Sequence, residues 1–131
     1  MAPVDSPPRP TLPSAEALAR IKAVVGDKGW SDDAEIQRAY VNDERGLYHG
    51  KCALLVRPET TRQVAEIVTI CHAEKIAIVP QGGNTGLVGA GVPHDYGAEI
   101  LLSLGRMNKI RDIDPLNYTV TVDAGCILAN L

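Results

Sequence analysis

The sequence of 131 residues predicts an α/β (α+β) fold, in which a small parallel βαβ sheet is followed by antiparallel strands. Two short apolar runs, 53–56 and 76–79, flank a segment with helical periodicity, and this order indicates parallel strands joined by a right-handed crossover. Near the C-terminus, residues 118–123 alternate between two faces, as in a half-buried strand. Hydrophobic residues make up 45% of the chain, which suits a single compact core.

The composition divides the chain into three parts. Residues 1–13 hold five of the nine prolines, and because proline fixes φ and lacks an N–H donor, we expect a disordered leader there. An N-terminal helical segment is expected over 14–52. The remaining residues, 53–131, contain the βαβ unit and the antiparallel strands.

Two helices are predicted in the N-terminal segment. Ser14 can cap a helix whose apolar residues recur every three and four positions, and Gly26 supplies its stop. Ser31 is expected to cap a second helix, on which Ile36 and Tyr40 lie one turn apart.

The βαβ unit follows. The run 53–56 is expected to be a strand buried on both faces, and Pro58 ends it. Residues 60–63 form a capping box for a helix that Lys75 closes, and the run 76–79 is the next strand. This helix is the clearest in the chain, because one of its faces carries the apolar residues Val64, Ile67, Val68 and Cys71.

The C-terminal part is expected to contain a third strand and a hairpin. The third strand covers 100–104. The hairpin pairs 110–113 with 118–122 through a turn at 114–117. Residues 127–131 begin a helical spacing without a C-terminal stop signal, so we expect the chain to be the N-terminal portion of a longer protein.

Charge and hydropathy exclude two classes of partner. Thirteen Lys and Arg against 16 Asp and Glu leave a net charge of −3, so no basic excess indicates a nucleic-acid surface. The longest uncharged stretch, 76–94, is broken by glycines and prolines and is a poor match for a membrane span. We therefore expect no nucleic-acid partner and no membrane segment.

The cysteines and histidines suggest neither a disulfide framework nor a metal site. The cysteines are odd in number, form no C-x-x-C pair and follow no signal peptide, which favours a reduced, cytoplasmic setting. No spacing among these residues is that of metal ligands. The residues concerned are Cys52, Cys71, Cys126, His49, His72 and His94.

The segment 82–91 is the candidate site, because it places five glycines in ten residues at the carboxyl end of a predicted parallel strand, where ligands bind in α/β folds. Glycine lets backbone N–H groups approach a ligand closely, and Asn84 and Thr85 add side-chain donors. Such a loop could hold a pyrophosphate by hydrogen bonds, without a Lys or Arg of its own. The alternative is a tight surface loop without a ligand.

Two familiar nucleotide-binding loops do not match this segment. The Rossmann fingerprint needs glycines at positions one, three and six, and no three glycines here have that spacing. Gly86 and Gly91 have the separation of the P-loop glycines. However, Val92 and Pro93 stand where the P-loop requires Lys and Ser or Thr.

The run 79–89, Val-Pro-Gln-Gly-Gly-Asn-Thr-Gly-Leu-Val-Gly, resembles the pyrophosphate-binding loop of the FAD-linked oxidases of the vanillyl-alcohol oxidase and p-cresol methylhydroxylase (PCMH) superfamily. Four other segments resemble, in the same order, the branch that contains D-2-hydroxyglutarate and D-lactate dehydrogenases. These segments are 55–61, 102–110, 114–117 and 124–128.

The resemblance implies that 53–131 is a partial PCMH-type FAD-binding domain, truncated at its C-terminal end. It would hold the first α/β subdomain and the opening antiparallel strands of the second. Members with covalent flavin carry a His in this loop, and its absence here implies non-covalent FAD. The residues that match cofactor-binding positions are Pro80, Gln81, Gly82, Gly83, Asn84, Thr85, Gly86, Leu87, Val88, Gly89, Ser103, Arg106 and Met107.

The resemblance also implies an oxidoreductase that oxidises a D-2-hydroxy acid, such as 2-hydroxyglutarate or lactate, by hydride transfer to FAD. The family's catalytic and metal-binding residues lie beyond residue 131, so no catalytic or metal-binding residue is assigned and this chain alone is expected to be inactive. Two alternatives stay open. One is another FAD-linked oxidase, such as a glycolate oxidase subunit, and the other is a truncated domain that binds FAD weakly or not at all and self-associates through its exposed face.

Overall fold

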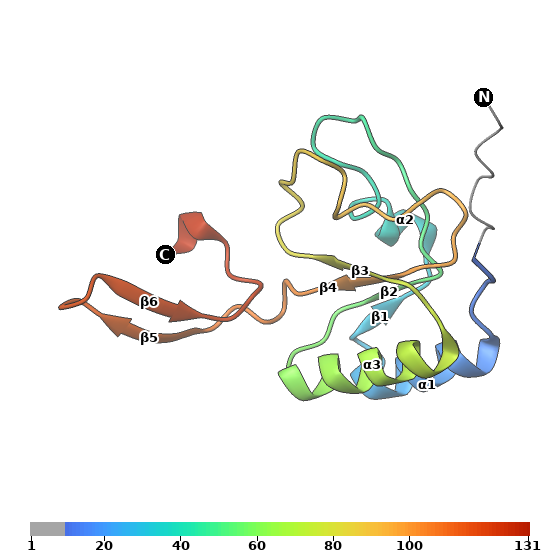
Figure 1. The fold of residues 1–131 in the computed structure, drawn as a ribbon, viewed down its shortest axis with the longest axis horizontal. Helices are drawn as coiled ribbons and strands as arrows, with labels where there is room; N and C mark the ends of the chain where they lie inside the picture. The colour runs from blue at the N-terminus through green and yellow to red at the C-terminus, as the bar shows by residue number, and fades with distance from the viewer. Residues whose placement is uncertain (1–9) are drawn as a thin grey trace, which may run out of the picture.

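The computed structural model describes residues 10–131. Most of the predicted leader, residues 1–9, lies outside the described residues. Figure 1 shows a sheet with α1 and α3 side by side along one face, and a β5–β6 hairpin that extends away from that sheet. The elements are α1 (Ala15–Val25), β1 (Trp30–Ser31), α2 (Ala34–Gln37), β2 (Leu54–Val56), α3 (Thr61–Glu74), β3 (Ile78–Gln81), β4 (Ile100–Ser103), β5 (Ile110–Asp114), β6 (Thr119–Val122) and the 3₁₀-helix η1 (Leu128–Asn130).

The main sheet has the strand order β1-β2-β4-β3. Strands β2 and β3 both run parallel to β4, which confirms the predicted parallel arrangement, although β4 lies between them. Leu101 of β4 is level with Leu55 on one side and Val79 on the other. The hairpin β5–β6 is antiparallel and forms a separate two-stranded sheet, as predicted. The mixed α/β fold class is therefore confirmed.

One face of the main sheet packs against the two long helices. Leu54 and Ile100 point to this face and are fully buried with Ile21 of α1 and Ile67 of α3. Leu54 and Ile100 are shielded from solvent because the two helices cover this face. Loops cover the other face, so the sheet is buried on both sides, as is usual for parallel strands. This cluster is the larger part of the core.

The opposite face carries no long helix. Leu55, Val79 and Leu101 form a second buried cluster with Cys52, and Tyr40 packs against it. Short helix α2 and the two long loops of the chain cover this face (Figure 1). Alternate residues along β2 therefore belong to different clusters, which explains the unbroken apolar run in the sequence.

The predicted caps of the two long helices are confirmed. Ser14 Oγ accepts a hydrogen bond from Ala17 N at 3.1 Å, and α1 ends at Gly26, whose φ is 68°. Thr60 Oγ1 accepts from Gln63 N at 3.2 Å, and the Gln63 side chain accepts from the backbone N–H of Glu59 at 2.7 Å. These bonds satisfy N–H groups that have no partner inside the helix.

The second predicted helix is much shorter than expected. Ser31 does not cap it. Ser31 belongs to β1 and is level with Leu55 of β2, and its Oγ accepts from Asp33 N at 3.2 Å, before the helix begins. Asp33 is the cap, with its Oδ1 accepting from Glu35 N at 2.8 Å. The helix ends at Gln37, before Tyr40.

Other boundaries also differ from expectation, and β2, β4 and β5 each differ by one residue at one end from the predicted 53–56, 100–104 and 110–113. The second parallel strand covers 78–81 and not 76–79, and it tolerates Pro80 because β3 is the edge strand of the sheet. Strand β6 starts one residue late, because Tyr118 has a φ of 53° and belongs to the turn. The expected C-terminal helix is the short 3₁₀-helix over 128–130.

Removing side-chain volume from the helix-covered face should destabilise the fold. Ile67 is fully buried, so Ile67→Ala should lower the free energy of unfolding by about 2–5 kcal/mol, as a cavity in a packed core does. Urea unfolding followed by circular dichroism measures this change. Val68→Ala is the matched control, because Val68 is the next residue on α3 and is 44% exposed; an equal effect of both substitutions would contradict the described core.

Candidate functional site

The glycine-rich segment 82–91 begins where β3 ends, at the carboxyl edge of the parallel strands. Strand β4 also ends at this edge, and residue 105 follows it after a single residue. The topology therefore brings two glycine-containing turns to one edge of the sheet. This is the edge at which open α/β sheets bind ligands.

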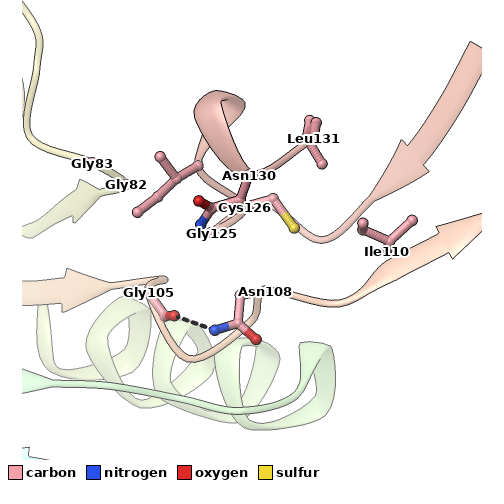
Figure 2. A pocket seen from close by; sticks show the side chains of 10 residues that line it. Gly82, Gly83, Gly105, Asn108, Ile110, Gly125, Cys126, Asn130 and Leu131 are labelled. Carbon is pink, nitrogen blue, oxygen red and sulfur yellow. Dashed lines mark hydrogen bonds between the residues drawn. The ribbon is translucent and has the colours of Figure 1, made fainter.

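A cavity of about 350 Å³ lies between the glycine loop, the turn after β4 and the C-terminal segment. Figure 2 shows Gly82 and Gly83 on one side of it and residues that follow β6 on the other. Among residues 10–131, no charged side chain lines the cavity. Its lining consists of Gly82, Gly83, Gly105, Asn108, Ile110, Gly125, Cys126, Ile127, Asn130 and Leu131.

A second hollow of about 220 Å³ is formed within the glycine loop itself. Gly82 and Gly83 line both hollows, so the backbone at these two residues separates adjacent spaces. The remaining lining of the second hollow is Pro80, Gln81, Asn84, Thr85, Gly86, Gly89, Gly91 and Val92.

The fold itself does not require glycine at three positions of the loop. A Cβ added at Gly83 or Gly86 would meet no atom within 4 Å, and one at Gly82 would meet only the Ala124 carbonyl oxygen, at 4.0 Å. None of the three has a left-handed φ. The absence of side chains here leaves the backbone open to an approaching group, which is the property expected of a ligand-binding loop.

By contrast, the fold does require glycine at two other positions. Gly89 has a φ of 74°, and a Cβ there would lie 2.9 Å from the Tyr48 ring. A Cβ at Gly125 would lie 1.8 Å from the Leu104 carbonyl oxygen. Gly125 N also donates to Met107 O at 2.9 Å, so this residue lets the segment after β6 pack closely on the turn after β4.

Asp123 holds the base of the hairpin beside the cavity. Its carboxylate accepts from Arg111 Nε at 2.5 Å and from Lys109 N at 3.2 Å. The hydrogen bond from the Arg111 side chain, followed by the bond from the Lys109 backbone, keeps the pKa of Asp123 below its usual value. The charged carboxylate therefore joins the start of β5 to the end of β6.

Two amide side chains, one at the end of β3 and one in the loop, form hydrogen bonds that hold the loop in its observed conformation. Gln81 is buried, and its Nε2 donates to Tyr40 O at 2.7 Å and to Gly91 O at 2.8 Å. Asn84 has a left-handed φ of 55°, and its Nδ2 donates to Asn42 O at 2.7 Å. Asn84 was expected to supply a side-chain donor to a ligand, but in this structure its amide binds protein.

The other residues expected at the site lie at different depths. Ser103 and Met107 are buried beneath the turn after β4, while Leu87 and Val88 are 61% and 78% exposed at the tip of the loop. Arg106 points to the start of α3: its Nη1 donates to Arg57 O at 3.1 Å and its Nη2 is paired with Glu59. Arg106 lines neither hollow.

Several lining residues were not among the expected contacts. Gly105, Asn108, Gly125, Cys126 and Ile127 surround the larger cavity with the loop glycines. The sequence signal for some of them was present, because 102–110 and 124–128 belong to segments that carry the family resemblance. Only the packing of the segment after β6 on the turn after β4, through Gly125, shows that these segments meet.

Three further features of the described residues bear on other kinds of site. Within residues 10–131, no three His, Cys, Asp or Glu side chains gather as a metal site would require. No helix in the described part of the chain has the length and apolar character to cross a bilayer. Burial raises the pKa of both Cys52 and Cys71 to about 11, so these thiols are protonated and unreactive near neutral pH.

Residues 52–131 match the family model described as "FAD binding domain". The chain is 40% identical over 119 residues to the probable mitochondrial D-2-hydroxyglutarate dehydrogenase of Oryza sativa subsp. indica, covering 90% of this chain and 21% of that protein. It is also 40% identical over 125 residues to the putative mitochondrial D-lactate dehydrogenase of Schizosaccharomyces pombe, covering 89% of this chain and 23% of that protein.

Among solved structures, p-cresol methylhydroxylase with bound substrate aligns with a TM-score of 0.70 and 28% identity, covering 85% of this chain and 22% of that chain. The chain spans about a fifth of the length of the curated relatives it matches. The alignment covers a similar fraction of p-cresol methylhydroxylase, so the chain and that enzyme share one part of a larger fold.

A side chain at Gly83 should weaken FAD binding without affecting the fold. Gly83→Val places two methyl groups where the backbone is open, so FAD affinity should fall by at least about tenfold, which is 1.4 kcal/mol. Gly89→Ala is the matched comparison. The Cβ of the new alanine would meet the Tyr48 ring, so this variant should also have a lower midpoint of thermal unfolding. Flavin fluorescence titration and thermal unfolding measure the two effects; unchanged FAD affinity in Gly83→Val would show that this backbone does not meet the cofactor.

Proposed function

Because the chain belongs to the FAD binding domain family, with FAD as its cofactor, we propose that it is the FAD-holding part of an enzyme that oxidises a D-2-hydroxy acid. The open backbone at Gly82, Gly83 and Gly86 is the observation that supports this proposal most strongly. A Cβ at these positions would extend into the space a ligand needs. The residues present therefore fit a dinucleotide that carries a pyrophosphate.

The lining of the site suggests how the chain would bind the cofactor. The backbone N–H groups of 82–86 are suited to donate to the phosphate oxygens, and the site uses no Lys or Arg in the two hollows. Ile110, Ile127 and Leu131 form an apolar wall of the larger cavity, which would exclude water from a bound ring system. Bound FAD supplies the hydride-accepting chemistry.

The proposal includes non-covalent binding of FAD. The loop 82–91 contains neither Cys nor His. Cys126 does line the larger cavity, and its Sγ lies 3.6 Å from the Lys109 carbonyl oxygen, toward which it can donate a weak hydrogen bond. Acid denaturation should release all flavin into the supernatant. Flavin that precipitates with the protein would contradict non-covalent binding. If the Cys126→Ser variant then no longer retained that flavin, the covalent bond would be located at Cys126.

The proposed substrate class rests on the relatives, two of which are named for D-2-hydroxyglutarate and D-lactate. We expect the protein expressed from the full open reading frame to be purified with FAD and to lose its oxidised-flavin absorbance when mixed with D-2-hydroxyglutarate or D-lactate under anaerobic conditions. The L-enantiomers and glycolate are the controls. A flavin that only glycolate reduces would favour the alternative of a glycolate-oxidising enzyme, and a protein without FAD would overturn the proposal.

A second candidate applies to the 131-residue chain alone: self-association with weak or no FAD binding. The hairpin and the segment that follows it expose apolar side chains, including Leu116 at 90%, Tyr118 at 95% and Leu128 at 84%. Sedimentation velocity should therefore show dimers or larger species, and Tyr118→Lys should reduce them. A chain that is monomeric at all concentrations would exclude this candidate.

The cellular compartment stays a prediction. The buried thiols Cys52 and Cys71 fit the reduced, cytoplasmic setting that the cysteine count suggests. The rice and fission yeast relatives, however, are named as mitochondrial proteins. Fractionation of cells that produce the tagged protein would decide, and recovery in mitochondria would overturn the cytoplasmic prediction.

A further inference from the structure

The glycine loop is supported by a segment that lies outside the matched family region of 52–131. This segment, 40–51, runs alongside the loop over its whole length, as the two long loops above the sheet in Figure 1 show. Tyr40 O accepts from the Gln81 side chain at 2.7 Å near the start of the loop. Beyond the end of the loop, Lys51 N donates to His94 O at 2.8 Å.

The closest contacts come from the turn 43–48. Arg45 Nη2 donates to Leu87 O at 2.5 Å, so the tip of the loop is tied to this turn. The Tyr48 ring lies directly against Gly89, where a Cβ would be 2.9 Å from ring carbons. Immediately before the turn, Asn42 O accepts from the Asn84 side chain at 2.7 Å.

Asp43 closes this turn. Its Oδ1 accepts from Leu47 N at 2.7 Å and from Tyr48 N at 2.8 Å, and the residue is only 6% exposed. The backbone of Tyr48, followed by those of Leu47 and Arg45, keeps the pKa of Asp43 below its usual value. The carboxylate is therefore charged near neutral pH, and it fixes the position from which the Tyr48 ring meets the loop.

A loop with five glycines in ten residues has a large conformational entropy to lose when it binds a ligand. Contacts that hold it in one shape beforehand reduce that loss and so raise affinity. The loop makes these contacts through the Leu87 carbonyl, the Asn84 side chain and Gly89. None of them uses a backbone N–H of 82–86, so these amides stay available for a ligand.

We infer that the turn 43–48 is a positioning element of the cofactor site, in which the Tyr48 ring sets the shape of the loop 82–91 and thereby the affinity for FAD. Tyr48 acts through the loop and touches neither the pyrophosphate nor the substrate. The effect on FAD affinity rests on the proposed function. The effect of Tyr48 on the shape of the loop 82–91 involves only residues of this chain.

Three variants of the full open reading frame test the affinity. Tyr48→Ala removes the ring and should weaken FAD binding about tenfold, as measured by flavin fluorescence titration. Tyr48→Phe keeps the ring and should restore wild-type affinity. Leu47→Ala is the matched control on the same turn, because its side chain is 62% exposed, and it should leave affinity unchanged.

Hydrogen exchange of the FAD-free protein tests the positioning itself. In Tyr48→Ala, the amides of 82–91 should exchange faster than in the wild type, while those of α3 keep their protection because the core is intact. Unchanged exchange over 82–91, or equal FAD affinity of Tyr48→Ala and the wild type, would overturn this inference. A wild-type protein that binds no FAD would instead overturn the proposed function.

Discussion

The backbone hydrogen bonds of β4, with β2 on one side and β3 on the other, determine where the candidate site lies. Because all three strands are parallel, their carboxyl ends share one edge, and both glycine-containing turns emerge there. The burial of Ile100, Leu101 and Leu102 on both faces of β4 makes this pairing the centre of the core. The chain after β4 then leads to the hairpin. The segment that follows β6 returns to the same edge of the sheet, where Gly125 packs against the turn after β4.

Glycine has two different functions at this edge. At Gly89 and Gly125 the neighbouring atoms leave no room for a Cβ, so these residues are needed for the protein to pack on itself. At Gly82, Gly83 and Gly86 there is room, so the packing of the described residues does not account for glycine there. A ligand-binding loop needs glycine of this second kind, because it leaves the backbone amides open to an approaching group. We propose that these amides bind an anionic cofactor without the help of Lys or Arg.

Much of the fold could be predicted from the sequence, since apolar periodicity and caps such as Ser14 and Thr60 are local signals. One error concerned Ser31, which lies in β1 beside Leu55 of the distant strand β2, while the helix begins only after Asp33. Another was local, because the left-handed φ of Tyr118 extends the hairpin turn by one residue. The loop and its position were also predictable, but its supports were not. Nothing near Tyr48 in the sequence indicates that its ring lies on Gly89, 41 residues later. The cavity likewise exists only because the segment after β6 packs on the turn after β4.

We propose that the open backbone of the glycine loop holds the pyrophosphate of FAD, and a crystal structure of the protein with FAD would test this. Phosphate oxygens should lie within about 2.7–3.2 Å of backbone nitrogens in 82–86, with the ring system beside Gly105 and Gly125. A pyrophosphate bound elsewhere, with Gly83 and Gly86 facing solvent, would contradict it.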